Sequence, residues 1–116
     1  MSVKRVGNVF FAVDDLDAAA SFYADVLGLP VKFRDGDRWM AFDAGGTTLA
    51  LAGPPEDAVA APGAMVSLEV ADLDEWIAAA HARGLDAGPV QTGPHERSVL
   101  VRDPAGNVLT IYAKLG

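Results

Sequence analysis

The side chains that can carry acid–base or metal chemistry are few in this sequence. It has two histidines and no cysteine among 116 residues. Without cysteine there is no thiolate nucleophile, no disulfide and no thiolate metal ligand. His81 directly follows Ala80, late in a predicted helix, where we expect a surface histidine. The sequence assigns no Ser–His–Asp arrangement and no glycine-rich phosphate loop.

One short run of residues offers more chemistry than the rest. His95, Glu96 and Arg97 are consecutive and lie in a predicted turn or strand edge. Such a cluster can bind a polar ligand or act as a general acid and base. An ordinary solvated turn accounts for the same residues, and the sequence leaves both interpretations open.

The elements that must position these groups form two similar halves. In each half an apolar strand precedes a helix that begins at an aspartate, Asp15 or Asp72, and ends at a glycine, Gly28 or Gly84. Three strand-like runs follow each helix, at residues 30–37, 38–44 and 47–53 in the first half and 85–91, 97–103 and 107–114 in the second.

This order predicts an α+β fold of two tandem βαβββ modules within a single domain, residues 1–116. The modules span about residues 1–53 and 64–116, joined by a linker at 54–63 that is rich in Pro, Ala and Gly. Each helix covers one sheet face, so the other face needs a second module, a partner chain or a ligand.

The charge balance narrows the classes of partner. The chain has 9 Lys and Arg against 16 Asp and Glu, a net charge of −7. This balance argues against nucleic acid and against anionic membrane surfaces, because both need clustered basic residues. No apolar run is long enough for a transmembrane helix and no signal peptide is visible, so we expect a cytoplasmic protein.

Two segments and a turn resemble a known family. They are VFFAVDDLDAAASFYADVLGL, VSLEVADLDEWIAAAHARGL and the terminal VRDPAGNVLTIY. Together they resemble the vicinal oxygen chelate superfamily, which includes glyoxalase I, extradiol dioxygenases, fosfomycin-resistance enzymes and bleomycin-resistance binding proteins. The resemblance covers nearly the whole chain. It implies a curved mixed sheet around a ligand cavity, and a homodimer.

The resemblance also implies where a metal would bind. Metal-dependent members carry a ligand, usually His, on the first strand of each half and another, usually Glu, on the last strand of each half. Here those positions hold Asn8, Ala50, Met65 and Thr110. None offers an imidazole or carboxylate, and the Met65 thioether suits soft metals only. We therefore expect no metal, no cofactor and no family-type metal chemistry.

The resemblance implies that these four positions face the ligand cavity, and strand alternation then assigns the other side chains. The predicted helix-facing core contains Val9, Phe11, Val13, Leu49, Leu51, Val66, Leu68, Leu109 and Ile111. Tyr112 and Phe10 would stack against a ligand, Glu69 would meet a cationic group, and Ala50, with Ala12 and Ala52, would leave room. Trp39 can face either side of its strand. The full predicted ligand-binding set is Asn8, Phe10, Trp39, Thr48, Ala50, Met65, Ser67, Glu69, His95, Arg97, Thr110 and Tyr112.

These features favour a metal-free protein that binds a small aromatic molecule, as an antibiotic-sequestering resistance protein does. Two alternatives remain. One is a glyoxalase-like lyase, isomerase or dioxygenase with an atypical site around His95 and Glu69. The other is a degenerate module that serves protein interaction or regulation. The positions that lack metal ligands weigh against an enzyme.

Overall fold

The computed structural model describes residues 6–54 and 65–115. The chain divides into two units, Met1–Ala60 and Ala61–Gly116. Apart from Pro54, the predicted linker at residues 54–63 lies outside the described residues. Each unit follows the predicted βαβββ order, which confirms the α+β class.

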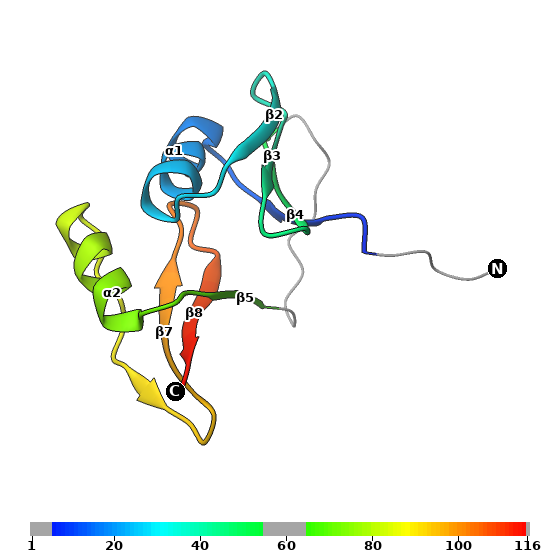
Figure 1. The fold of residues 1–116 in the computed structure, drawn as a ribbon. Coiled ribbons are helices and arrows are strands. Elements are labelled where there is room, and N and C mark those ends of the chain that lie inside the picture. The colour runs from blue at the N-terminus through cyan, green and yellow to red at the C-terminus, as the bar shows by residue number, and fades with distance from the viewer. Residues whose placement is uncertain (1–5, 55–64, 116) are drawn as a thin grey trace. The chain divides into compact units, whose positions relative to one another are not determined.

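The first unit is a four-stranded mixed sheet with one helical segment (Figure 1). The Asp15 carboxylate accepts a hydrogen bond from the backbone N–H of Ala18 at 3.1 Å, which begins the helix as predicted. At the other end Gly28 has φ 72°, a left-handed conformation that glycine adopts without a steric penalty. The elements are β1 (Val9–Ala12), α1 (Leu16–Ser21), the π-helical turn η1 (Phe22–Val26), β2 (Val31–Asp35), β3 (Trp39–Asp43) and β4 (Thr48–Ala52).

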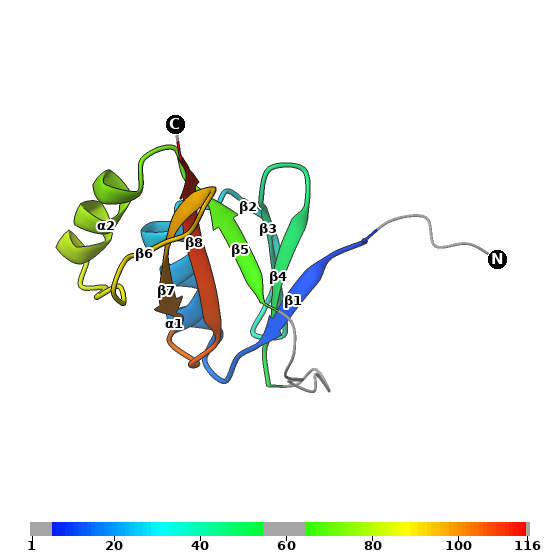
Figure 2. The same ribbon diagram turned by 90° about the horizontal axis from the view of Figure 1, so that it is seen from below.

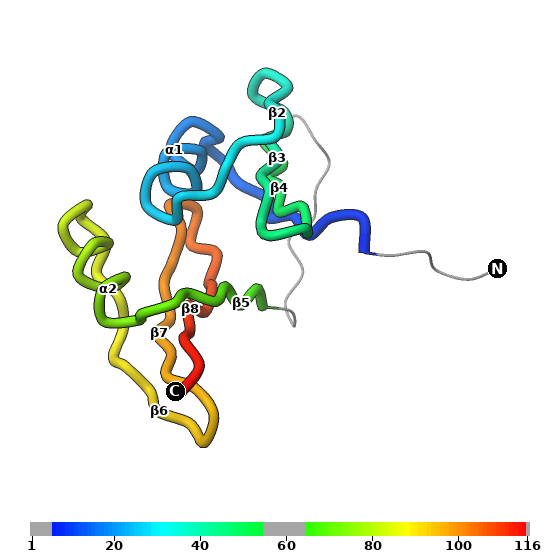
Figure 3. The backbone as a smooth tube through the Cα atoms, in the orientation of Figure 1, coloured from blue at the N-terminus to red at the C-terminus, as the bar shows by residue number. Residues whose placement is uncertain are grey.

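The strands of this sheet lie in the order β1-β4-β3-β2. The outer strand β1 runs parallel to β4, and the remaining pairs are antiparallel. The tight hairpin between β2 and β3 is plain in the backbone trace (Figure 3). The parallel pair needs a crossover, and the helical segment between β1 and β2 provides part of it.

The second unit repeats this topology with the strand order β5-β8-β7-β6. Its helix begins at Asp72, whose carboxylate accepts from the backbone N–H of Glu75 at 3.0 Å. Figure 2 shows β5 beside β8 and β8 beside β7. The elements are β5 (Val66–Glu69), α2 (Leu73–Ala82), β6 (Gln91–Thr92), β7 (Glu96–Arg102) and β8 (Val108–Lys114).

The two cores differ in chemistry. In the first unit Tyr23 of η1 is fully buried, and its ring lies 5.1 Å from Phe22 and 5.9 Å from Phe42, between ring centroids. In the second unit the largest fully buried side chains are aliphatic: Leu109, Ile111, Val99 and Val101. Aromatic pairs add to the free energy of apolar burial, so the units are stabilised by different means.

Two details differ from the sequence expectations. The strand expected at residues 85–91 is reduced to the two residues of β6, because Pro89 lacks an N–H and only Gly88 donates to Leu100 of β7. Val9, expected in the core, is 37% exposed, since it lies on the edge strand β1. In the part of the chain that the structure describes, none of the helices is long and apolar enough to cross a membrane.

Candidate ligand-binding surfaces

The strand register shows which side chains share a face of the first sheet. Phe42 contacts Tyr23 and therefore faces the helical segment. The residues that alternate with it form a row on the opposite face: Phe10, Ala50, Ala41 and Phe33. Trp39 pairs with Ala52, which pairs with Ala12, so all three belong to this same face. The register thereby answers the open question of which side Trp39 occupies.

Two aromatic rings meet across this face. The ring centroids of Phe10 and Trp39 are 5.4 Å apart at an interplanar angle of 53°. Phe10 lies on β1 and Trp39 on β3, with β4 between them. The rings thus lean over β4, whose Ala50 and Ala52 are 0% and 1% exposed. The free space expected above these alanines is therefore filled, which corrects the expectation that they leave room.

The polar candidates of the first unit lie around this aromatic pair. Asn8 is exposed at the start of β1. Thr48 is half-buried, and its hydroxyl accepts a hydrogen bond from the Lys32 ammonium at 2.9 Å. Thr48 is thus engaged within its own sheet, whereas Phe10 is 45% exposed and keeps an accessible ring surface.

The second sheet presents a polar face. Leu109 and Ile111 alternate with Thr110 and Tyr112 along β8, and the two apolar residues are buried as predicted. Ser67 pairs with Thr110, and Glu69 pairs with Tyr112 across the parallel β5–β8 ladder. On the other side of β8, Leu100 pairs with Thr110, Ser98 with Tyr112, and Glu96 with Lys114. These partners share the face that alternates with the buried residues.

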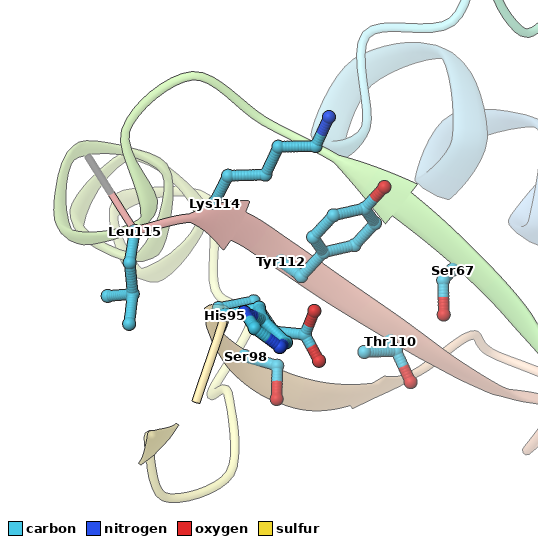
Figure 4. A pocket seen from close by; sticks show the side chains of 8 residues that line it. Ser67, His95, Ser98, Thr110, Tyr112, Lys114 and Leu115 are labelled. Atoms are coloured by element: carbon cyan, nitrogen blue, oxygen red, sulfur yellow. The ribbon is translucent and has the colours of Figure 1, made fainter. Parts of the chain in front are cut away.

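This face is hollowed in two adjoining places. The first hollow has a volume of about 460 Å³ and is lined by Ser67, His95, Glu96, Ser98, Thr110, Tyr112, Lys114 and Leu115 (Figure 4). The second, of about 630 Å³, shares Ser98 and Thr110 with the first and adds apolar side chains that include Met65, Leu100 and Val108. Volumes of this size suit small molecules.

The Glu69 carboxylate interacts with two residues that line the first hollow, Tyr112 and Lys114. The Tyr112 hydroxyl donates to Oε1 of Glu69 at 3.2 Å, and Nζ of Lys114 lies 4.0 Å from the same oxygen. Partial burial raises the pKa of Tyr112, and the negative charge of Glu69 raises it further. The phenol therefore stays protonated and remains a hydrogen-bond donor to the carboxylate at neutral pH.

The His95-Glu96-Arg97 run does not act as one cluster. His95 and Glu96 line the hollow. Arg97 pairs with Ala113, which is buried on the opposite face. Its guanidinium donates two hydrogen bonds to the Asp74 carboxylate, at 3.1 and 3.2 Å. These bonds raise the pKa of Arg97 and lower that of Asp74. Arg97 thus ties β7 to α2 and does not line the hollow, which corrects its expected placement.

Several residues of the hollow were absent from the predicted set. They are Glu96, Ser98, Lys114 and Leu115. Strand alternation contains the signal for three of them, because Lys114 follows Tyr112 by two residues, and Glu96 and Ser98 flank Arg97. Applying alternation to the last two strands would have found these three and removed Arg97.

The residues at the positions where the family resemblance implies metal ligands do not fit a divalent cation. Ala50 is fully buried and has no donor atom, and Met65 is 55% exposed and offers only a thioether. Asn8 and Thr110 provide neutral oxygens. Across residues 6–54 and 65–115, no three His, Cys, Asp or Glu side chains group in a way that could hold a metal ion.

Comparisons with known proteins agree with this architecture. An uncharacterized protein of Mycolicibacterium smegmatis is 38% identical over 120 residues, which cover 99% of this chain and 98% of that protein. The structure of a lactoylglutathione lyase from Agrobacterium tumefaciens matches with a TM-score of 0.79 and 26% identity, over 97% of this chain and 96% of that chain.

A fosfomycin resistance protein from Listeria monocytogenes, crystallised with Mn(II) and a dihydroxypropylphosphonic acid, shares the fold. Its TM-score is 0.77 at 13% identity, over 96% of this chain and 90% of that chain. In sequence, residues 5–111 match the family model of the Glyoxalase/Bleomycin resistance protein/Dioxygenase superfamily. The chain therefore belongs to this superfamily.

Proposed function

We propose that this protein is a metal-free binding protein that sequesters a small aromatic molecule, in the manner of a resistance protein. One observation carries the proposal: Asn8, Ala50, Met65 and Thr110 stand where metal-dependent relatives carry their ligands. Members of the superfamily include both enzymes and resistance proteins. Without imidazole or carboxylate donors at these positions, binding without metal chemistry is the simpler function.

The aromatic class of ligand is supported by the Phe10–Trp39 pair. Phe10 is 45% exposed although its ring is large and apolar. Its ring and that of Trp39 form an edge against which a flat aromatic molecule can stack. Such stacking adds about 0.5–1.5 kcal/mol beyond the area that it buries.

Tryptophan fluorescence tests this proposal. The chain has two tryptophans, so Trp76→Phe in α2 leaves Trp39 as the only one. We expect a panel of planar aromatic antibiotics and flavin-like compounds to contain a ligand that changes Trp39 emission and raises the melting temperature. Phe10→Ala should weaken that ligand, and Phe33→Ala, on the same sheet face but at strand β2, is the matched control. A panel without any ligand would contradict the aromatic class.

Metal titration tests the other half of the proposal. Zn²⁺, Ni²⁺ and Fe²⁺ should leave the melting temperature nearly unchanged. A metal at one hundred times its dissociation constant would stabilise the fold by about 2.7 kcal/mol. A stoichiometric shift of that size would contradict metal-free binding and would favour an enzyme.

A lyase-type or isomerase-type enzyme is the second candidate. The observation in its favour is the hollow of the second sheet, which places His95 near the Tyr112 that donates to Glu69. These groups can exchange protons with a bound molecule. Conversion of a bound compound by purified protein, lost in both His95→Ala and Glu69→Gln, would establish it.

We further propose that the protein is a cytoplasmic homodimer. The absence of cysteine fits a reducing compartment. Each sheet has one face without a helix of its own module, and a second copy of the chain can cover such faces. The predicted linker would also permit exchange of a strand between chains. Light scattering should give the dimer mass at about 10 μM, where a micromolar dimer is largely formed; a monomer at that concentration would contradict it.

A further inference from the structure

A row of hydroxyl groups crosses the second sheet. Ser67 on β5 lies directly opposite Thr110 on β8, and Ser98 on β7 lies opposite Tyr112, one pair further along. All three side chains line the same hollow. Within the described residues, the Tyr112 hydroxyl donates to Glu69, whereas the hydroxyls of Ser67, Thr110 and Ser98 do not hydrogen-bond to another protein group. Three hydroxyls from three neighbouring strands are therefore available, each able to donate and to accept.

The charged groups around the row favour a cation. Glu69 and Glu96 are the carboxylates beside the row, and Lys114 is the ammonium that lies between them in the register. The other cation of this face, Arg102, pairs with Val108 and lines the second hollow. Lys114 is 4.0 Å from Glu69, and both side chains are largely accessible to water. Such a pair is weak and easily replaced by a ligand ammonium. His95 also lines the hollow.

Tyr112 supplies the remaining element of the site. Its ring stands beside the hydroxyl row, with Lys114 extending past it on the same strand (Figure 4). Its hydroxyl donates to Glu69 and so holds the carboxylate at the edge of the hollow. An aromatic face next to a carboxylate attracts an ammonium group through both charge and the ring quadrupole.

From this arrangement we propose that the hollow binds a small polyhydroxylated amine of the amino-sugar type. The ligand ammonium lies at Glu69 against Tyr112, and its hydroxyls bond to Ser67, Thr110 and Ser98. The volume of about 460 Å³ admits a single sugar ring. The inference rests on the proposed binding function and names the polar chemistry that the second sheet recognises.

Three sugars that differ in one substituent test the inference. The probes are glucosamine, which is cationic, and glucose and N-acetylglucosamine, which are neutral. Binding is followed by amide chemical shifts of the uniformly labelled chain of 12.1 kDa. We expect glucosamine to bind in the millimolar range, to shift the amides of Ser67, Thr110 and Tyr112, and to bind about tenfold more tightly than either neutral sugar.

Matched variants then locate the site. Glu69→Gln should weaken glucosamine about tenfold and leave glucose unchanged, because only the charge-assisted bond is lost. Glu75→Gln on α2 removes an exposed carboxylate outside the hollow and should have no effect. Tyr112→Phe removes the hydroxyl that holds Glu69 and should also weaken glucosamine binding. The amide spectrum of each variant shows whether it is folded.

The possible outcomes separate this inference from the proposed function. Equal binding of glucosamine and N-acetylglucosamine, or shifts confined to other residues, would overturn the amine site. If glucosamine does not bind but an aromatic ligand changes Trp39 emission, only this inference is contradicted, and the proposed function is still supported. Glucosamine binding without any aromatic ligand would support this site and overturn the aromatic class.

Discussion

The two sheets have the same topology, but large and small side chains are distributed in opposite ways on the faces that no helix of the same unit covers. In the first sheet the large side chains Phe10 and Trp39 stand on β1 and β3, the two strands that flank β4, and β4 itself carries Ala50 and Ala52. In the second sheet the equivalent central strand carries Thr110 and Tyr112, and the equivalent flanking positions are the small residues Ser67 and Ser98. One face is thus closed by rings that lean inward, whereas the other remains hollow.

The helix-covered faces differ far less. Leu49 and Leu51 in the first unit, and Leu109 and Ile111 in the second, hold equivalent positions on the last strand and are all buried. A packed core tolerates little change in volume, while the opposite face has no such restriction. Repetition of one module therefore maintains two cores and leaves two faces free to acquire different chemistry.

The largest effects are expected at the shared core positions. Leu49→Ala and Leu109→Ala should each lower the free energy of unfolding by about 2–5 kcal/mol, through lost burial and a residual cavity. Denaturant unfolding measures both. Ser67→Ala, on the hollow face, is the control and should change it by no more than about 0.5 kcal/mol. If one leucine variant is silent, the two cores are not equivalent.

Because rings from the flanking strands cover β4, and no such rings in the described part of the chain cover β8, the same substitution at equivalent positions of the two strands should have different effects on stability. Ala50→Leu must push apart the Phe10 and Trp39 rings and should cost about 1–3 kcal/mol of stability. Thr110→Leu, at the same position of the second sheet, extends into the hollow and should leave stability nearly unchanged while blocking glucosamine. Denaturant unfolding and amide chemical shifts report the two effects. Equal costs at the two positions would show that the first face is no more closed than the second.

Alternation made much of this arrangement predictable. Residues 108–114 alternate without interruption, so the buried Leu109 and Ile111 and the half-buried Thr110 and Tyr112 were assigned to their faces from sequence. Alternation alone does not decide the face of Trp39, because that face depends on the register of β3 against β4. That register pairs Trp39 with Ala52, and hairpin register follows turn geometry as well as sequence pattern.

The remaining differences came from neighbours distant in sequence. The sequence shows that the side chains at positions 50 and 52 are small. It does not show that the rings of Phe10 and Trp39, from two other strands, cover them. Alternation along β7 removes Arg97 from the hollow face, but it does not identify its partner, Asp74 on α2, which is 23 residues away in the sequence. In both cases the decisive contact spans strands or elements that local spacing does not bring together.

A smaller effect is expected at the Arg97–Asp74 pair, which ties β7 to α2 as the ion pair between Arg34 of β2 and Asp17 ties the first sheet to α1. Hydrogen bonds from Arg97 and its positive charge lower the pKa of Asp74. This pair therefore adds stability above the ordinary aspartate pKa, and the contribution is lost as the pH falls through the lowered value. In Arg97→Gln the pKa of Asp74, followed by carboxyl NMR, should return to its ordinary range. Glucosamine binding should not change, and a change would place Arg97 in the hollow after all.

The smallest expected effect is the alkaline titration of the Tyr112 phenol. The first sheet has no equivalent tyrosine, because Ala52 holds the corresponding position there. Partial burial, followed by the charge of Glu69, raises the pKa of Tyr112 above its ordinary value of 10.0. The folded protein therefore holds the phenol proton more tightly than the unfolded chain does. Its contribution to stability is complete below the unfolded pKa and is lost as the pH rises through the folded one.

Phenolate absorbance of the wild type minus that of Tyr112→Phe isolates this titration from Tyr23, the other tyrosine of the chain. Glu69→Gln removes a negative charge and should move the pKa of Tyr112 part of the way back, since burial is the larger cause and remains. Glu75→Gln should leave it where it is. A Tyr112 pKa at or below 10.0 would mean that the ring is fully hydrated and not held by Glu69, and the hollow face would then lack the hydrogen bond that distinguishes it from the first sheet.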